Sequence, residues 1–238
     1  MKIIQFEEID STNSYLKREA HNLDDLSFCE AVLQTNGRGR YYRNWEAEKG
    51  KNLTFSLLIK DPQLINKFSS ISLLAAYVIS QVLTNLKIKD VSIKWPNDVY
   101  VNGQKICGIL LESTSIGENV SYLVLGIGLN VNQTFFYGDF DATSIFLKTK
   151  KISSLETLKI IIYEKLINEL SLLKENKSSY LNACRKLNYL RGKLCTATYN
   201  NESIRFHVLD INDDNSLLVE IDNKKISINS GEISLIRN

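Results

Sequence analysis

One segment of the chain combines three arginines with two glycines. Residues 36–45 read Asn-Gly-Arg-Gly-Arg-Tyr-Tyr-Arg-Asn-Trp. The glycines let backbone N–H groups approach a ligand closely, and the guanidinium groups offer forked donors to phosphate or carboxylate oxygens. The segment is not a dinucleotide fingerprint, because a third glycine is missing and a strand pattern, not a helix, follows it. It therefore predicts an anion-binding loop, with a solvated basic surface loop or a single-stranded RNA contact as the alternatives.

A carboxylate and an ammonium group stand at the two ends of a predicted hairpin. Residues 94–98 read Lys-Trp-Pro-Asn-Asp, and Lys105 follows the turn Asn102-Gly103. A hairpin there returns the chain, so that Asp98 and Lys105 can face one pocket. Together they would bind a charged substrate or position an incoming amine. The alternative is an ordinary cross-strand ion pair, which contributes little at a surface.

Two further motifs suggest ligand contact. Ser11-Thr12-Asn13 stands at the start of a predicted helix, where the alternative is a plain N-cap. Residues 126–130 read Gly-Ile-Gly-Leu-Asn inside a predicted buried strand. Small residues there indicate close approach of a ligand or of another backbone, or else tight strand packing.

The elements that must position these motifs follow from hydrophobic periodicity. Alternation predicts strands at residues 29–35, 52–60, 91–95, 98–101, 106–112 and 121–131. Helical spacing predicts four helices. The first follows Ser11 or Thr12, and the second spans 68–86. The third follows a capping box of Ser153 with Glu156, and the fourth spans 179–190 and ends before Gly192. Residues 36–51 and 133–150 are predicted loops.

The pattern changes near residue 190. From Lys193 onward, short alternating strands are separated by Asn- and Asp-rich turns at 200–201, 213–215 and 222–223. The sequence therefore predicts an α+β fold, with a mixed sheet and helices over residues 1–190 and a small β-barrel over 191–238.

Composition excludes several classes of protein. The 238 residues are 44% hydrophobic and 24% charged, and Lys plus Arg number 29 against 27 Asp plus Glu. This balance gives no general attraction to nucleic acid or to an anionic membrane. The first ten residues carry acids where a signal peptide needs an apolar run, and the apolar stretch 71–83 is too short to span a bilayer. Four scattered cysteines with two histidines supply no zinc-ligand spacing, so we expect reduced thiols in a cytoplasmic protein.

The order and spacing of the motifs resemble those of the biotin–protein ligases. The resemblance rests on Ser-Thr-Asn at 11–13, Gln34 ahead of Gly-Arg-Gly-Arg-x-x-Arg-x-Trp, Lys-Trp-Pro-Asn-Asp, Lys-x-x-Gly-Ile-Leu at 105–110, Gly-Ile-Gly-Leu-Asn, and a tail with Gly-Glu-Ile-Ser at 231–234. It implies a class II synthetase-like catalytic domain of the biotin/lipoate ligase type and an SH3-like C-terminal barrel. Some bacterial members carry an N-terminal DNA-binding domain. Because Ser-Thr-Asn begins at residue 11, we expect the short type, which binds no DNA and does not repress transcription.

The resemblance also implies a two-step reaction. Biotin and ATP give biotinyl-5′-AMP and pyrophosphate, with Mg²⁺ accompanying ATP. A lysine of a biotin carboxyl carrier domain of a biotin-dependent carboxylase, such as acetyl-CoA carboxylase, then receives the biotin. The resemblance identifies no metal-binding side chains, and it is compatible with a homodimer.

The resemblance assigns roles to single residues. Lys105 would hold the biotin carboxylate and stabilise the transferring phosphoryl group, Arg40 would clamp the phosphate side, and Asp98 would orient the acceptor amine. These three are the expected catalytic residues. The expected biotin-binding residues are Ser11, Thr12, Asn13, Gln34, Arg38, Gly39, Arg40, Lys105 and Gly108. The expected ATP- or adenylate-binding residues are Arg40, Arg43, Trp45, Asn97, Lys105 and Asn130.

Two other functions would use parts of the same motifs. A lipoate–protein ligase shares the fold and the reaction type, but the arginine and Lys-Trp-Pro-Asn-Asp motifs favour biotin. A non-enzymatic RNA-binding module would use the arginine–aromatic loop, yet a net charge of +2 does not make the strongly basic face that such modules show.

Overall fold

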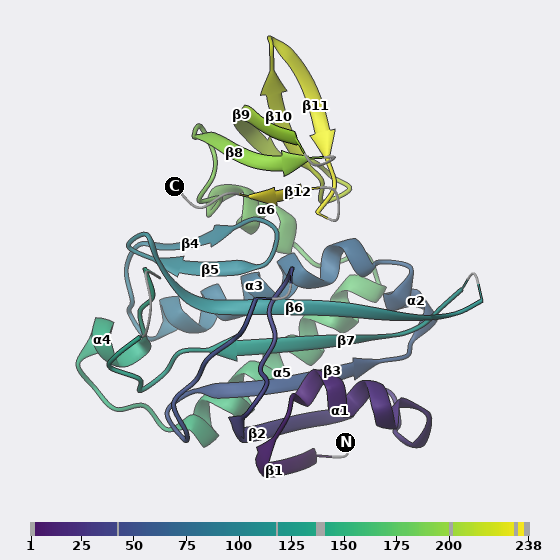
Figure 1. Cartoon of the computed structure of the whole chain (residues 1–238), viewed down its shortest axis with the longest axis vertical. Helices are drawn as coiled ribbons and strands as arrows, with labels where there is room; N and C mark the ends of the chain where they lie inside the picture. The colour runs from purple at the N-terminus through teal and green to yellow at the C-terminus, as the bar shows by residue number, and fades with distance from the viewer. Residues whose placement is uncertain are drawn as a thin grey trace.

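A computed structural model describes residues 3–41, 43–117, 119–136, 141–199, 202–230 and 233–235. Within these residues, a seven-stranded sheet carries helices on both faces and a five-stranded sheet lies beyond its β4 edge (Figure 1). The predicted α+β class is therefore confirmed. The predicted turn at 200–201, the first two residues of the tail motif, and Tyr42 lie outside the described residues.

The large sheet has the strand order β1-β2-β3-β7-β6-β5-β4. Its strands are β1 (Ile3–Ile9), β2 (Phe28–Gln34), β3 (Leu53–Ile59), β4 (Val91–Lys94), β5 (Asp98–Val101), β6 (Gln104–Ile116) and β7 (Asn119–Leu129). β1 and β2 are parallel, and every other neighbouring pair in this sheet is antiparallel. The mixed sheet predicted from the sequence is thus present, with β6 longer than predicted and β7 shifted two residues toward the N-terminus.

Helices cover the two faces of this sheet differently. α1 (Thr12–Glu19) lies in front of the sheet in Figure 1, where Leu16 packs with Leu58 and Val124. α3 (Phe68–Asn85) and α5 (Leu155–Lys174) lie behind it and cover the main apolar core. The shorter helices are η1 (Ala20–Asn22), α2 (Pro62–Ile65), α4 (Ile145–Thr149) and α6 (Tyr180–Lys186).

α3 is long and apolar enough to cross a membrane by length and composition alone. It is longer than the apolar stretch 71–83, because polar residues at both ends continue the helix. Its buried residues, Ile71, Leu74 and Val78 among them, pack into the main core beneath the sheet. This burial is typical of the central helix of a globular fold.

Several predictions about elements were wrong. The N-cap of α5 is Ser154, whose Oγ accepts from the Thr157 N–H at 3.2 Å, so the predicted box of Ser153 with Glu156 does not form. α6 ends at Lys186 and not at 190, because Ile93 of β4 bonds to the backbone of Leu187 and Tyr189 instead. The predicted loop 133–150 contains α4, and β1 was not predicted.

The small sheet has the order β11-β10-β9-β8-β12 and is antiparallel throughout. Its strands are β8 (Leu194–Tyr199), β9 (Glu202–Ile211), β10 (Leu217–Ile221), β11 (Lys224–Ile228) and β12 (Ile233–Leu235). A separate C-terminal β structure is thus confirmed. Its closure into an SH3-like barrel and the domain boundary after residue 190 stay predictions.

Asn215 links this small sheet to the large one. Its backbone carbonyl accepts from Trp95 Nε1 at 2.9 Å, its Oδ1 accepts from the Tyr180 hydroxyl at 2.7 Å, and its Nδ2 donates to Ser70 Oγ at 3.1 Å. One apolar cluster also runs from the large sheet into β8 and β9 through Ala197 and Phe206. The two sheets therefore share a core at this point.

The four thiols give a first testable prediction. Burial raises the pKa of Cys29 and of Cys184 to about 12 and also raises the pKa of Cys107, whereas Cys195 is partly exposed and its pKa is raised less. Because the thiolate is the nucleophile, iodoacetamide at pH 8 should modify Cys195 first and the other thiols only after unfolding. Intact mass with and without guanidinium measures this. Rapid multiple labelling of the native protein would contradict the described burial.

Candidate active site

Three glycines form the floor of a pocket on the sheet face that carries α1. Gly108 of β6 pairs with Gly128 of β7, and Gly126 lies two residues earlier on β7. A Cβ atom at Gly128 would lie 2.3 Å from the Trp45 ring, and one at Gly126 would lie 2.3 Å from Asn13 Oδ1. The sequence predicted close approach of a ligand or of another backbone at residues 126–130; in the structure the side chains of Asn13 and Trp45 make this approach.

The arginine segment folds back on itself above this floor. Trp45 N donates to Gly37 O at 2.9 Å, and Gly39 N donates to Arg43 O at 2.7 Å. A Cβ atom at Gly37 would lie 2.4 Å from Trp45 O, so this close backbone approach requires glycine there. The predicted loop therefore has a defined, hairpin-like shape in its described residues.

Arg40 connects this loop to two other parts of the chain. Its Nη1 donates to Asn97 Oδ1 at 3.4 Å, and its Nη2 donates to the Tyr41 hydroxyl at 3.0 Å. The same Nη2 also donates to the carbonyl of Ser230, which lies between β11 and β12. Arg40 thus lies between the Lys-Trp-Pro-Asn-Asp segment and the C-terminal region.

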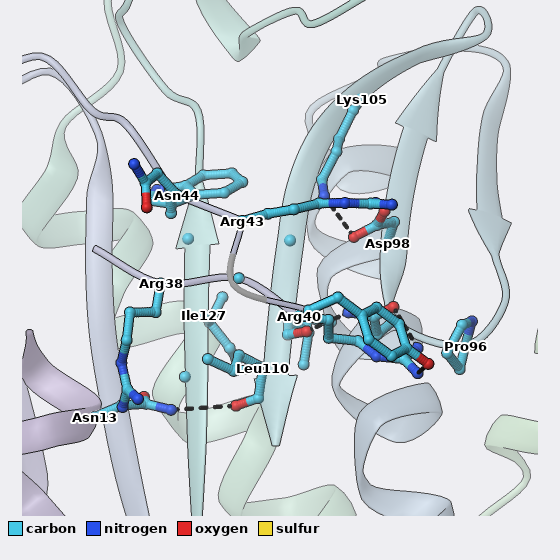
Figure 2. A pocket seen from close by; sticks show the side chains of 18 of the residues that line it. Asn13, Arg38, Arg40, Arg43, Asn44, Pro96, Asp98, Lys105, Leu110 and Ile127 are labelled. Carbon is cyan, nitrogen blue, oxygen red and sulfur yellow. Dashed lines mark hydrogen bonds and ion pairs between the residues drawn. The ribbon is translucent and has the colours of Figure 1, made fainter. Parts of the chain in front are cut away.

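Asp98 and Lys105 form an ion pair in the pocket. Lys105 Nζ lies 2.7 Å from Asp98 Oδ1, and both side chains are about one-fifth exposed. Asn102 and Gly103 take left-handed backbone angles, φ +50° and +77°, which close the β5–β6 hairpin and bring the two groups together. Figure 2 shows this pair, with the side chain of Arg43 extending toward it.

The charges around this pair are unbalanced. Among the described residues, five basic side chains and one carboxylate line the pocket; they are Arg38, Arg40, Arg43, Lys94, Lys105 and Asp98. Arg38 lies at the opposite end, beside Asn13 (Figure 2), so the pair itself is surrounded by the other basic groups. Partly desolvated positive charge attracts a polyanion more strongly than the same charge in water. This end of the pocket therefore suits phosphate and carboxylate groups.

The opposite end of the pocket is polar and mostly neutral. Thr12 N and Thr12 Oγ1 both approach Gln34 Oε1, at 2.8 and 3.0 Å. Ser11 Oγ accepts from Ser14 N at 3.4 Å, so Ser11 caps α1 and also lines the pocket. Figure 2 shows Asn13 and Arg38 together at this end, with Asn13 Nδ2 directed to the carbonyl of Leu110.

A second hollow adjoins the first. Arg43, Trp45 and Lys105 line both, and the second is completed by residues that include Gln133, Phe135 and Asn130. Asn130 is buried, and its Nδ2 donates to Thr143 O at 3.0 Å. The structure therefore places Asn130 beyond Trp45, away from the neutral end of the first pocket.

Two buried donors in the site lack a partner among the described residues. They are Trp45 Nε1 and Arg38 Nε. Buried polar groups in folded proteins are nearly always hydrogen-bonded, so an unpaired donor at a pocket wall indicates a ligand or solvent position. Both atoms lie on the loop that covers the glycine floor.

The predicted site residues can now be placed. All predicted biotin-binding residues line the first pocket, as do the catalytic ones. Of the adenylate set, Asn130 is the member that lines the second hollow and not the first. Their assigned roles stay predictions. Ser56 and Glu112, which contact Asn13 at 2.5 and 2.9 Å, were not predicted. Ser56 could have been identified as a polar residue in an otherwise apolar, buried strand. Glu112 could have been identified because it lies on the same face of β6 as Gly108.

The described residues contain no group of three or more His, Cys, Asp or Glu side chains that could hold a metal ion. The carboxylate that lines the first pocket, Asp98, is paired with Lys105. A divalent cation that accompanies a nucleotide would fit this site mainly through phosphate and water ligands, as Mg²⁺ prefers.

Comparison with known proteins identifies a matching family profile and similar solved structures. The profile of the Biotin/lipoate A/B protein ligase family matches residues 5–130. Among solved structures, the biotin protein ligase from Aquifex aeolicus in complex with biotin and ATP superposes with a TM-score of 0.87 at 26% identity, covering 100% of this chain and 99% of that chain.

Curated sequences also include relatives of this chain. The biotin–[acetyl-CoA-carboxylase] ligase of Paracoccus denitrificans is 35% identical over 124 residues, which cover 51% of each chain. The bifunctional ligase/repressor BirA of Bacillus subtilis is 35% identical over 125 residues, which cover 50% of this chain and 38% of that protein. The match thus spans about half or less of the curated relatives.

Proposed function

The chain belongs to the biotin/lipoate A/B protein ligase family, and from this premise we propose that it is a biotin–protein ligase. The enzyme activates biotin with Mg²⁺-ATP to biotinyl-5′-AMP and transfers biotin to a lysine of a biotin carboxyl carrier domain. The observation that carries the proposal is one pocket with a neutral hydrogen-bonding end and a cationic end. The first end suits a ureido ring, and the second suits a carboxylate that meets a triphosphate.

The first step brings two anions together. An oxygen of the biotin carboxylate attacks the α-phosphorus of ATP, the bond to the β-phosphate oxygen breaks, and pyrophosphate leaves. Fixed positive charge at the reacting groups offsets their repulsion and stabilises the charge that develops on the phosphoryl oxygens. Lys105 and Arg43 line both hollows, and Arg40 lies beside them, so these residues have the position that this role requires.

The second step needs a nucleophilic amine. The acceptor lysine nitrogen attacks the carbonyl carbon of the mixed anhydride, AMP leaves, and the amine proton passes to Asp98 or to solvent. Asp98 is paired with Lys105 in the free protein. When the acyl-adenylate engages Lys105, this pair would loosen and leave the Asp98 carboxylate for the incoming amine.

Two alternatives are less favoured. Lipoate carries an apolar dithiolane ring with no N–H groups, which the polar groups of Thr12, Asn13 and Gln34 do not match. An RNA-binding module would need an open basic face, whereas the arginines line a pocket. The proposed partner is the carrier domain, with no DNA and no membrane partner, in the cytoplasm; a homodimer is compatible with the same chemistry.

The test is incubation of the protein with biotin, Mg²⁺-ATP and a carrier domain, followed by intact mass of the carrier. A gain of one biotinyl group that requires ATP supports the proposal. Parallel reactions with lipoic acid test the alternative. No gain with biotin, or an equal gain with lipoic acid, would reject the assignment to biotin.

Asp98→Asn should separate the two half-reactions. Asparagine keeps a carbonyl oxygen for Lys105 but loses the charge that would position an ammonium group or accept its proton. We expect transfer from added biotinyl-adenylate to fall by about 100-fold, while pyrophosphate release without acceptor changes by less than about threefold. Arg40→Ala is the comparison variant and should mainly weaken adenylate formation. Equal losses in both steps for Asp98→Asn would remove the assigned role.

A further inference from the structure

A chain of side chains runs beneath the neutral end of the pocket. Its links are Glu112 to Asn13 at 2.9 Å, Asn13 to Ser56 at 2.5 Å, Ser56 to Thr12 at 2.7 Å, and Thr12 to Gln34 at 3.0 Å. Thr12, Asn13 and Ser56 are each less than 5% exposed. Thr12, Asn13 and Gln34 line the pocket, whereas Ser56 and Glu112 contact these residues from behind.

Glu112 sets the orientation of Asn13. Its carboxylate pairs with Arg38 Nη2 at 2.8 Å and with Lys17 Nζ at 3.2 Å, in addition to Asn13 Nδ2. An ionised carboxylate can accept but cannot donate, so Asn13 must turn its NH₂ group to Glu112 and its carbonyl to Ser56. Gly126 is packed against that carbonyl, where a Cβ atom would lie 2.3 Å from Asn13 Oδ1.

Gln34 is fixed from the other end of the chain. Its Oε1 accepts from the Thr12 backbone N–H at 2.8 Å, so this atom is an acceptor. Three oxygen–oxygen contacts then remain, namely Gln34 to Thr12, Thr12 to Ser56, and Ser56 to Asn13. The two hydroxyl groups hold two protons for these three contacts. One of these three contacts therefore has no proton between its oxygens, which leaves an acceptor of the network without a donor. Thr12 and Gln34, which make two of the contacts, line the neutral end of the pocket.

We infer that Glu112 and Ser56 are positioning residues of the biotin site, which hold Thr12, Asn13 and Gln34 as a network with a spare acceptor that selects a ligand bearing N–H groups. A ureido ring supplies such donors, and a dithiolane ring does not. Unpaired buried acceptors penalise the ligand that cannot donate to them. The inference rests on the proposed function and concerns how the same site distinguishes biotin from lipoic acid.

Substitutions at Glu112 isolate its acceptor oxygen. Glu112→Met keeps most of the volume and removes every acceptor, whereas Glu112→Gln keeps one oxygen for Asn13 and Arg38 and can turn its NH₂ toward the partly exposed Lys17. We expect the biotin Kd, measured by calorimetry without ATP, to rise about tenfold for Glu112→Met and less than about threefold for Glu112→Gln.

Ser56→Ala removes a hydroxyl with almost no change of volume. The Asn13 carbonyl then loses its donor, and we expect an approximately tenfold rise in the biotin Kd. Ser80→Ala is the matched control, because Ser80 is also buried but donates to Tyr77 O within α3, outside the pocket. Its biotin Kd should equal that of the parent.

Three measurements distinguish positioning from general support of the fold. The Kd for ATP and the Tm of Glu112→Met and Ser56→Ala should stay near the parent values, while the ratio of lipoic acid Kd to biotin Kd should fall. Parent-like biotin binding in both variants would overturn the inference, and so would a joint loss of biotin binding, ATP binding and Tm. A parent protein that does not bind biotin at all would instead reject the proposed function, and this inference with it.

Discussion

Replacement of Lys105 by alanine is expected to slow pyrophosphate release from ATP and biotin by about 100-fold or more, which corresponds to about 3 kcal/mol of transition-state stabilisation. Lys105 lines both hollows of the site, so its ammonium lies where the carboxylate of one ligand would meet the phosphates of the other. With alanine at position 105, the negative charges of the carboxylate and the phosphates are left uncompensated. Asp98 also loses its ion-pair partner. Single-turnover pyrophosphate release at saturating biotin and ATP measures the effect.

Lys174→Ala is the matched control for this substitution. Lys174 pairs with Asp61 at 2.5 Å near α2, so its removal also breaks a lysine–carboxylate pair, but outside the pocket. The control should turn over at the parent rate. If Lys105→Ala also kept the parent rate while remaining folded by circular dichroism, the proposed stabilisation of the phosphoryl group by Lys105 would be wrong.

Gly126→Ala is the second substitution with a large expected effect. The new Cβ would lie 2.3 Å from Asn13 Oδ1 and 3.0 Å from Asn13 Cγ. The backbone of β7 cannot retreat, because β3 and β6 hold it on both sides, and Asn13 cannot retreat, because Glu112 and Ser56 hold its amide. Overpacking of this kind costs about 1–3 kcal/mol, and here it must displace the Asn13 amide that lines the pocket. Because biotin binding would have to restore that amide against the same cost, we expect biotin affinity to fall by about 10- to 100-fold.

A double-mutant cycle tests the stated cause. In an Asn13→Ala background, the alanine at position 126 meets no amide and should add less than about a threefold further loss. Calorimetric biotin titration of the two single variants and the double variant supplies the comparison. Fully additive losses would show that Gly126→Ala acts through the sheet and not through Asn13.

Periodicity predicted the elements that are buried on one or both faces. β3 and α3 fell within a residue or two of their predicted bounds because nearly all of their apolar residues enter the core. β1 was missed because none of its residues is fully buried, which leaves an edge strand with acidic residues and a weak pattern. α4 was missed because one five-residue turn of helix has too few residues to show a period.

The sequence predicted those parts of the site that belong to recognisable motifs. The arginine loop and the Asp98–Lys105 hairpin carry residue types with clear chemistry, and the turn Asn102-Gly103 predicted their approach. Ser56 and Glu112 depend on which residues lie beside them across the sheet, and a single sequence does not specify that register. Asn215 was predicted merely as a turn residue, because its three partners come from distant elements.

The contacts of Asn215 also constrain the order in which the parts of the protein can fold during synthesis. Trp95 lies next to the segment that carries Asp98, yet the carbonyl that accepts from its indole belongs to a residue 120 positions later. Contacts between such distant residues form late, and a nascent chain exposes its N-terminal part first. A ribosome-bound chain therefore presents the arginine loop and the Asp98–Lys105 hairpin before the support for Trp95 has been synthesised. The pocket reaches its described geometry only after residue 215, and also residue 230, whose carbonyl accepts from Arg40, have left the exit tunnel.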